Sequence, residues 1–213
     1  MTRFLVFRHG QSDANLKEYF AGWTDAALTP LGAEQARLAA EYVSRTEKPC
    51  CVWTSELTRA YLTGKAFADV CRIPIFRSAA LNEIRAGRWE GVPFRDIKKL
   101  YMPDYSVWQN DVGNSRCTDG ESVRELADRV VKEVLRISSL YPDSTVVIAT
   151  HATPVMAIEA ASKLIPPDRF KDVPWRKNAS MSVVECDGKR LYPVRFGVLD
   201  HLGEKVSFDS DEV

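Results

Sequence analysis

The amino-acid sequence predicts an α/β protein with a mostly parallel sheet that carries helices on both faces. Segments typical of strands alternate along the chain with segments typical of helices, as expected for parallel strands joined by crossover helices. Residues 145–150 form a run rich in β-branched side chains, which suits a strand covered on both faces. Between positions 123 and 137, apolar side chains recur every three or four residues, which indicates one face of a long helix.

The N-terminal half is expected to supply two strands and two helices. Residues 3–7 are expected to form a short buried strand. A helix should begin at Thr29, a favourable N-cap residue, with Pro30 at its first position. Residues 50–54 are expected to form a second buried strand, followed by a helix over residues 56–70.

The C-terminal half should complete the sheet. The long helix after residue 122 leads into the strand at 145–150, and another helix is expected over about 154–164. Residues 179–186 and 190–198 are expected to form two closing strands joined by an Asp-Gly turn.

The chain is expected to fold as a single domain over residues 1–213, since α/β sheets with helical cover often reach this length before dividing. Residues from about 85 to 120 differ from the rest, because glycine and proline are mixed there with large aromatic side chains. We expect an irregular insertion there that lies over the sheet edge and covers the active site. The acidic tail at 209–213 is expected to fray.

Charge and hydropathy argue against two classes of partner. The chain has 29 basic and 29 acidic residues, so no net field attracts nucleic acid or an anionic membrane. No apolar run approaches the roughly 20 residues needed to cross a bilayer, and the N-terminus turns polar too soon for a signal peptide. We therefore expect neither nucleic acid nor membrane as a partner, and any anion site must be built from a few placed arginines.

The five cysteines indicate a reducing compartment, and we expect a cytoplasmic protein. Their number is odd, they show no Cys-x-x-Cys spacing, and two of them are adjacent in an apolar run. Free thiols explain this pattern better than a disulfide framework. The sequence lacks the paired histidine or cysteine spacing of a metal site. It also lacks the Gly-x-Ser-x-Gly sequence of a serine hydrolase.

Reactive side chains follow three of the predicted strands where each strand ends. Arg8 and His9 follow the first strand, and His151 follows the strand at 145–150. Arg59 lies in the first turns of the helix after the second strand. Because ligands bind beyond the carboxyl ends of parallel strands, we expect these four side chains to meet in one crevice.

Two arginines and two histidines suit phosphate chemistry. A guanidinium fork pairs with phosphate oxygens, after which a neutral imidazole can attack phosphorus and form a phosphohistidine that water hydrolyses. We therefore expect His9 as the nucleophile. Arg8, Arg59 and His151 are expected to stabilise the transferred phosphoryl group. Glu83 is the candidate general acid for the leaving alkoxide and, later, the base that activates water.

Each of these residues, taken alone, also has an ordinary structural explanation. Arg8 and His9 could cap a strand, and His151 could be a core histidine. Arg59 could lie on a helix surface and Glu83 could form a salt bridge. Their shared placement at one sheet edge favours the catalytic interpretation.

In its motifs the sequence resembles the histidine phosphatase superfamily, also called the phosphoglycerate mutase-like family, over nearly the whole chain. The matching blocks, in the family's order, are residues 8–15, 22–25, 28–32 with 35–36, 55–60 with 63, 81–84, 87 with 89–91, 120–122 and 150–151. The resemblance implies a three-layer α/β/α sandwich and a reaction with neither a metal nor an organic cofactor. It also implies that Arg8, His9, Arg59 and His151 form the phosphate pocket, with Glu83 as proton donor.

The same resemblance implies further contacts to the phosphate or the substrate. Asn15 is such a contact by its place in the first motif, and Gln11, Ser12, Gly22 and Ala152 are expected to contribute as well. Gln11 stands where the family commonly has glutamate, which removes a negative charge near the phosphate. Ala152 stands where glycine is common, and alanine is tolerated there only if its φ is negative.

The segment after Glu83 favours the phosphatase branch of the family. Mutases typically carry Glu-Arg-His-Tyr-Gly there, whereas this chain carries Glu-Ile-Arg-Ala-Gly-Arg-Trp-Glu-Gly. We therefore expect a phosphomonoesterase that acts on a small phosphorylated metabolite. Arg85 and Arg88 leave a cofactor-dependent phosphoglycerate mutase open, since either could meet a substrate carboxylate. A non-catalytic phosphate-binding pseudoenzyme is a third alternative, and the chain could pair as a homodimer.

Overall fold

A computed structural model describes residues 1–207 of the chain. Within this range one sheet of six strands has the order β3-β2-β4-β1-β5-β6. The expected frayed tail at 209–213 lies outside the described residues. The strands are β1 (Thr2–Arg8), β2 (Pro49–Thr54), β3 (Ile75–Arg77), β4 (Thr145–Thr150), β5 (Met181–Cys186) and β6 (Leu191–Val198).

The predicted mostly parallel sheet is confirmed. Strands β3, β2, β4 and β1 pair in parallel, and β4 lies between β1 and β2 with Val146 opposite Phe4. Strands β5 and β6 are antiparallel, because a short turn joins them. Gly188 lies in that turn with a φ of +90°, a conformation that glycine adopts without a steric penalty.

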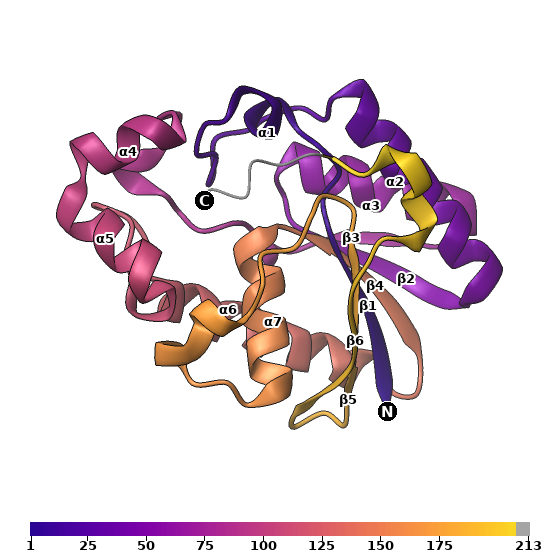
Figure 1. Cartoon of the computed structure of the whole chain (residues 1–213). Coiled ribbons are helices and arrows are strands. Elements are labelled where there is room, and N and C mark those ends of the chain that lie inside the picture. The colour runs from indigo at the N-terminus through magenta and orange to yellow at the C-terminus, as the bar shows by residue number, and fades with distance from the viewer. Residues whose placement is uncertain (208–213) are drawn as a thin grey trace.

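Two layers of helices cover the sheet, which confirms the α/β/α sandwich (Figure 1). The helices α2 (Pro30–Thr46) and α3 (Thr58–Cys71) cover one face, and α6 (Val123–Leu140) and α7 (Ala152–Lys163) cover the other. Alternate side chains of β1 enter the two cores. Leu5 and Phe7 pack in the core with α2 and α3, while Phe4 and Val6 pack in the core with α6 and α7.

The helix starts follow their capping residues. The Thr29 side chain accepts a hydrogen bond from the Gly32 backbone N–H and begins α2 as predicted. Helix α7 begins two residues earlier than predicted, at Ala152, and its N-cap residue His151 makes no side-chain capping hydrogen bond. The short strand β3 and the helix α1 (Asp13–Lys17) were not predicted, since three to five residues are too few to show a periodicity.

The segment from about 85 to 120, which we predicted to be irregular, contains two short helices. They are α4 (Phe94–Leu100) and α5 (Met102–Asn110), and they lie side by side at the left edge of the molecule in Figure 1. The side chains of Phe20, Trp89 and Trp108 pack edge to face and tie this segment to the rest of the chain.

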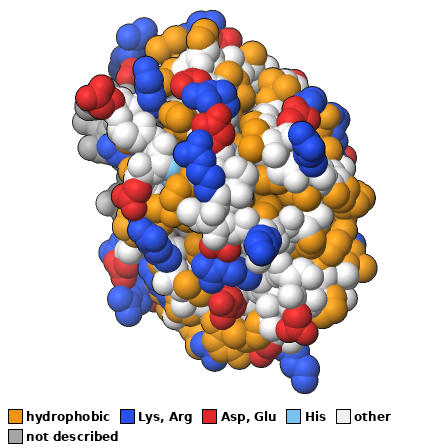
Figure 2. Space-filling view, turned by 90° about the vertical axis from the view of Figure 1, so that its right-hand side faces the viewer, with side chains coloured by type: hydrophobic (Ala, Val, Ile, Leu, Met, Phe, Trp, Pro, Cys, Tyr) orange, Lys and Arg blue, Asp and Glu red, His pale blue; other side chains and the backbone are white. Residues whose placement is uncertain are grey.

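Basic and acidic side chains are interspersed on the face shown in Figure 2, with no large area of one sign. This pattern agrees with the balance of 29 basic and 29 acidic residues. Among residues 1–207, no helix combines the length and the hydropathy that spanning a membrane requires.

Candidate active site

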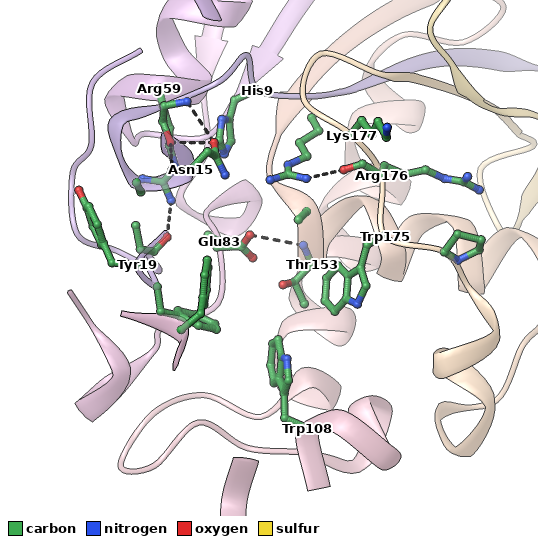
Figure 3. Close-up of a pocket in the computed structure, with 18 residues that line it drawn as sticks. His9, Asn15, Tyr19, Arg59, Glu83, Trp108, Thr153, Trp175, Arg176 and Lys177 are labelled. Atoms are coloured by element: carbon green, nitrogen blue, oxygen red, sulfur yellow. Dashed lines mark hydrogen bonds between the residues drawn. The ribbon is translucent and has the colours of Figure 1, made fainter. Parts of the chain in front are cut away.

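A cavity of about 370 Å³ lies at the carboxyl end of the parallel strands (Figure 3). Most of the residues that we expected to contact phosphate or substrate line it, although they come from separate parts of the chain. The predicted site residues that line it are Arg8, His9, Ser12, Asn15, Arg59, Glu83 and Ala152. His151 lies directly behind His9, whereas Gln11 and Gly22 do not line the cavity.

The His9 imidazole is held through Nδ1, and its Nε2 has no hydrogen-bond partner among residues 1–207. Its Nδ1 lies 2.7 Å from the backbone carbonyl oxygen of Gly10. Because a carbonyl oxygen only accepts hydrogen bonds, Nδ1 carries the proton and Nε2 keeps its lone pair. Burial, followed by the positive charges of Arg59 and Arg8, holds the pKa of His9 well below its ordinary value. The ring is therefore neutral and nucleophilic near neutral pH.

Arg59 is fixed by the loop that precedes α2. Its guanidinium is buried in the first turn of α3 and donates hydrogen bonds to the carbonyl oxygens of Ala21, Gly22 and Thr24 at 2.7–3.0 Å. Burial lowers the pKa of Arg59, but an arginine starts from so high a value that it stays charged near neutrality. Gly22 thus acts through its carbonyl group. A Cβ atom there would lie 2.2 Å from the Ile84 carbonyl oxygen.

Arg8 is positioned by a loop that no sequence motif marked. Its Nη1 donates to the carbonyl oxygen of Arg176 at 2.5 Å. The Arg176 guanidinium in turn donates two hydrogen bonds, at 2.8 and 2.7 Å, to the carboxylate of Glu159 in α7, which has no exposed surface. This buried ion pair holds the loop that carries Arg176 against the site.

His151 is oriented by a chain of hydrogen bonds through Ser55 and Asn82. Asn82 Oδ1 accepts from the Glu56 backbone N–H at 2.9 Å and from the Ser55 hydroxyl at 2.8 Å. Since the single Ser55 proton is used there, Ser55 Oγ accepts from His151 Nε2, 2.8 Å away. The neutral tautomer therefore carries its proton on Nε2. The Nδ1 atom is buried, with no hydrogen-bond partner among the described residues.

The imidazoles of His9 and His151 pack edge to face, with their centroids 5.1 Å apart. Burial and then the charge of Arg59 hold the pKa of His151 well below its ordinary value. Both histidines are therefore neutral near neutral pH, and a bound dianionic phosphate would favour protonation of His151.

The Glu83 carboxylate lies in the cavity next to the start of α7. It is 7% exposed, and its Oε1 and Oε2 accept hydrogen bonds from the backbone N–H groups of Ile84 (2.8 Å) and Thr153 (3.4 Å). The Glu83 backbone carbonyl accepts from Trp23 Nε1 and Arg129 Nη2. Neither side chain was predicted as a site residue, although Trp23 lies in the matching block 22–25, and together they fix the position of Glu83.

Asn15 presents its amide nitrogen to the cavity, because its oxygen is occupied. Asn15 Oδ1 accepts from the backbone N–H and the hydroxyl of Ser12, and from Nδ2 of Asn178 at 3.2 Å. Asn178 Nδ2 also donates to the His9 carbonyl oxygen at 3.0 Å. Asn178 comes from the loop before β5, and no sequence motif marked it.

Gln11 and Ala152 differ in their position relative to the cavity. The Gln11 side chain turns away from the cavity, where its Oε1 accepts from the Thr29 hydroxyl at 2.9 Å, so it does not meet a ligand there. Ala152 lines the cavity as the first residue of α7. It is not among the described residues with a positive φ, so alanine fits without strain.

The fold and the site together define a phosphatase of the α/β/α type. The sequence model of the histidine phosphatase superfamily (branch 1) matches residues 4–198, and the chain belongs to this superfamily. The predicted family and the predicted class, a phosphoric monoester hydrolase, are thereby confirmed.

Individual relatives agree with this assignment. The chain is 31% identical over 158 residues to the uncharacterized phosphatase PhoE of Bacillus subtilis, covering 74% of this chain and 76% of that protein. It is 27% identical over 207 residues to phosphoserine phosphatase 1 of Hydrogenobacter thermophilus, covering 96% of both. The solved structure of YhfR from Bacillus stearothermophilus superposes with a TM-score of 0.89 at 25% identity, covering 95% of this chain and all of that one.

Proposed function

We propose that this phosphatase hydrolyses a small phosphate monoester through a covalent phosphohistidine on His9. One observation carries the proposal. The Gly10 carbonyl accepts a hydrogen bond from His9 Nδ1, which leaves the lone pair on Nε2, and Arg8 and Arg59 line the cavity beside this ring. A neutral nitrogen nucleophile next to two guanidinium groups suits attack on a phosphate dianion.

In the first step, His9 Nε2 attacks phosphorus and the bond from phosphorus to the ester oxygen breaks. Glu83, in its protonated form, gives its proton to the departing alkoxide. In the second step, Glu83 takes a proton from water, which attacks the phosphohistidine and releases inorganic phosphate and neutral His9. Both steps need the same carboxyl group within reach of the phosphorus, and its place in the cavity supports this role.

Charge on the transferred phosphoryl group is balanced by several groups around the cavity. Arg8 and Arg59 supply guanidinium donors, and the amide nitrogen of Asn15 faces the same space. The N-terminus of α7, at Ala152 and Thr153, adds the positive end of a 12-residue helix dipole. His151 stabilises the group through its interaction with His9.

The positions of Arg85 and Arg88 support hydrolysis over a mutase reaction. Neither residue lines the cavity. Arg88 Nε donates to Asp119 at 2.6 Å on the surface, and Arg85 borders a separate surface groove together with Trp23 and Arg129. The second acidic group of a phosphoglycerate would therefore not be held by either arginine.

We further propose a cytoplasmic protein that binds no nucleic acid and pairs as a homodimer. Location in the cytoplasm is supported by the cysteines, since all five are free thiols. The absence of a nucleic-acid partner is supported only by the balanced charge. A homodimer is compatible with the edge strand β3, whose Phe76 is 38% exposed. Among residues 1–207, no group of three or more histidine, cysteine, aspartate or glutamate side chains is arranged to hold a metal ion.

The test is phosphate release from a panel of phosphomonoesters with EDTA present. We expect wild type to release phosphate and His9→Ala to release none. The matched control is His201→Gln, which alters the one histidine outside the site and should stay active. Rapid quenching in alkali should trap an acid-labile phosphoprotein in wild type and not in His9→Ala. Near-normal turnover by His9→Ala would overturn the covalent mechanism.

A further inference from the structure

The cavity has two chemically different ends. The phosphate end holds the charged and polar groups around His9. The other end is walled by apolar and aromatic side chains, namely Tyr19, Phe20, Phe94, Trp108, Pro174 and Trp175. Figure 3 shows Glu83 between His9 and the Trp108 indole, so a leaving group protonated by Glu83 would extend toward the aromatic end.

The aromatic side chains that wall this end of the cavity pack against one another. The indoles of Trp108 and Trp175 stack with their centroids 5.9 Å apart and their planes at 19°. Trp108 is 3% exposed and also packs edge to face on Phe20 at 5.6 Å, and Phe20 packs on Phe94 at 5.9 Å. Because these side chains are already ordered, little conformational entropy is lost when a ring binds against them.

Charged groups are scarce at this end of the cavity. The Arg176 guanidinium is bonded to the buried Glu159 carboxylate, and in Figure 3 its side chain extends away from His9 and Glu83. Lys177 lines the cavity and forms no ion pair within residues 1–207, so it is the cation that a second acidic group would have to use. A volume of about 370 Å³ leaves room for an organic group beyond the phosphate.

Building on the proposed phosphomonoesterase activity, we propose that the substrate is the phosphate ester of an uncharged alcohol that carries an aromatic ring. The ring lies against the partly exposed indole of Trp175, which Trp108 supports by stacking, while the phosphate meets Arg8 and Arg59. Flat apolar surfaces recognise flat apolar rings by stacking, and among residues 1–207 the aromatic end of the cavity is lined by no carboxylate and by no pair of cations.

The test compares three esters with primary-alcohol leaving groups, so that the chemistry of bond breaking stays similar. They are 2-phenylethyl phosphate, ethyl phosphate and 3-phosphoglycerate, whose leaving oxygen is also an alkoxide. We expect kcat/KM for 2-phenylethyl phosphate to exceed that for the other two by roughly tenfold to a hundredfold. In Trp175→Ala the ratio of 2-phenylethyl to ethyl phosphate should fall at least fivefold, while Trp175→Phe should keep most of it. The matched control is Phe76→Ala, which removes a half-exposed aromatic ring outside the cavity.

Binding provides an independent readout. The non-hydrolysable 2-phenylethylphosphonate should bind the wild-type protein at least tenfold more tightly than ethylphosphonate in calorimetry, and Trp175→Ala should remove most of that difference. Equal kcat/KM values for the phenylethyl and ethyl esters, or a preference for 3-phosphoglycerate, would overturn the aromatic substrate while leaving the phosphatase activity intact. Absence of hydrolysis of every ester would overturn the proposed function, and the phosphonate comparison would then decide the aromatic recognition by itself.

Discussion

The imidazole Nε2 of His151 lies 2.8 Å from the hydroxyl oxygen of Ser55, and this contact determines which nitrogen of His151 carries the proton. Ser55 gives its own proton to Asn82, so it can only accept from His151. The Nδ1 atom of His151 is therefore unprotonated and has no hydrogen-bond partner among residues 1–207, while the ring itself packs against His9. Ser55 and Asn82 are positioning residues that act through His151.

Replacing Ser55 by alanine should remove the hydrogen bond that sets the tautomer of His151. We expect Ser55→Ala to lower kcat/KM about tenfold, the effect of losing one hydrogen bond of roughly 1.4 kcal/mol. Nitrogen-15 NMR should show a mixed tautomer of His151 in the variant and a single Nε2–H tautomer in wild type. Ser138→Ala is the control, because the Ser138 hydroxyl is also buried and donates to the Leu135 carbonyl oxygen within α6, far from His151 in the hydrogen-bond network. An unchanged tautomer in Ser55→Ala would contradict the role of Ser55 as a positioning residue for His151.

Replacing Glu83 by glutamine should slow turnover in a way that depends on the leaving group. Glutamine keeps the size of the side chain but has no proton to give, so esters of alkyl alcohols should lose far more rate than p-nitrophenyl phosphate. The measurement is kcat across a series of esters of rising alcohol pKa. The exposed Glu56→Gln variant should behave as wild type. An equal loss for all esters would show that Glu83 is not the general acid.

Loss of the Arg59 side chain should affect both rate and stability. Arg59→Met should lower kcat/KM on the order of a hundredfold or more, by analogy with the removal of a preorganised donor. It should also lower the melting temperature, because three backbone carbonyl groups lose their hydrogen-bond donor. Arg72→Met, an exposed residue at the end of the same helix, serves as the control. A normal rate in Arg59→Met would show that this guanidinium does not take part in phosphate binding or transfer.

Acid should destabilise the fold through the two active-site histidines. The pKa values of His9 and His151 are lowered in the folded state, so below about pH 6.5 the unfolded chain binds protons that the folded chain does not. Stability is therefore full above that pH and is lost as the pH falls, by up to about 1.4 kcal/mol per pH unit for each group. Urea unfolding at pH 7.5 and 5.5 measures this loss. His9→Asn should lose less unfolding free energy between these two pH values than wild type does. An equal loss would contradict the lowered pKa of His9 as a cause of the acid sensitivity.

The ion pair between Arg176 and Glu159 should be important for stability. Arg176→Met leaves the fully buried Glu159 carboxylate without its partner, which typically costs about 3–5 kcal/mol. Denaturant unfolding measures this effect. In the double variant Arg176→Met, Glu159→Met neither charge of this pair remains, and much of the stability should return. If Arg176→Met alone were as stable as wild type, the pair would not hold the loop.

Sequence patterns predicted the central elements of the fold because each has a clear local signature. The β-branched run became β4, and the Thr-Pro start and the long apolar repeat became α2 and α6. Local signals failed in the segment between 85 and 120, where glycine and proline suggested irregular chain. Helices α4 and α5 form there because aromatic packing around Trp108 outweighs weak local propensity.

The sequence by itself determined the α/β class, the family, and the group of Arg8, His9, Arg59, Glu83 and His151, because strand ends and motifs mark these residues locally. Only the tertiary structure decided how they are held. Asn178 and the indole of Trp175 reach the site from a loop with no periodicity and no motif, and Gln11 turns away from it. The physical reason is that these hydrogen bonds and ring contacts join residues from 18 to 169 positions apart, so they depend on where the sheet brings two loops together. Such a contact leaves no pattern in either local stretch of sequence.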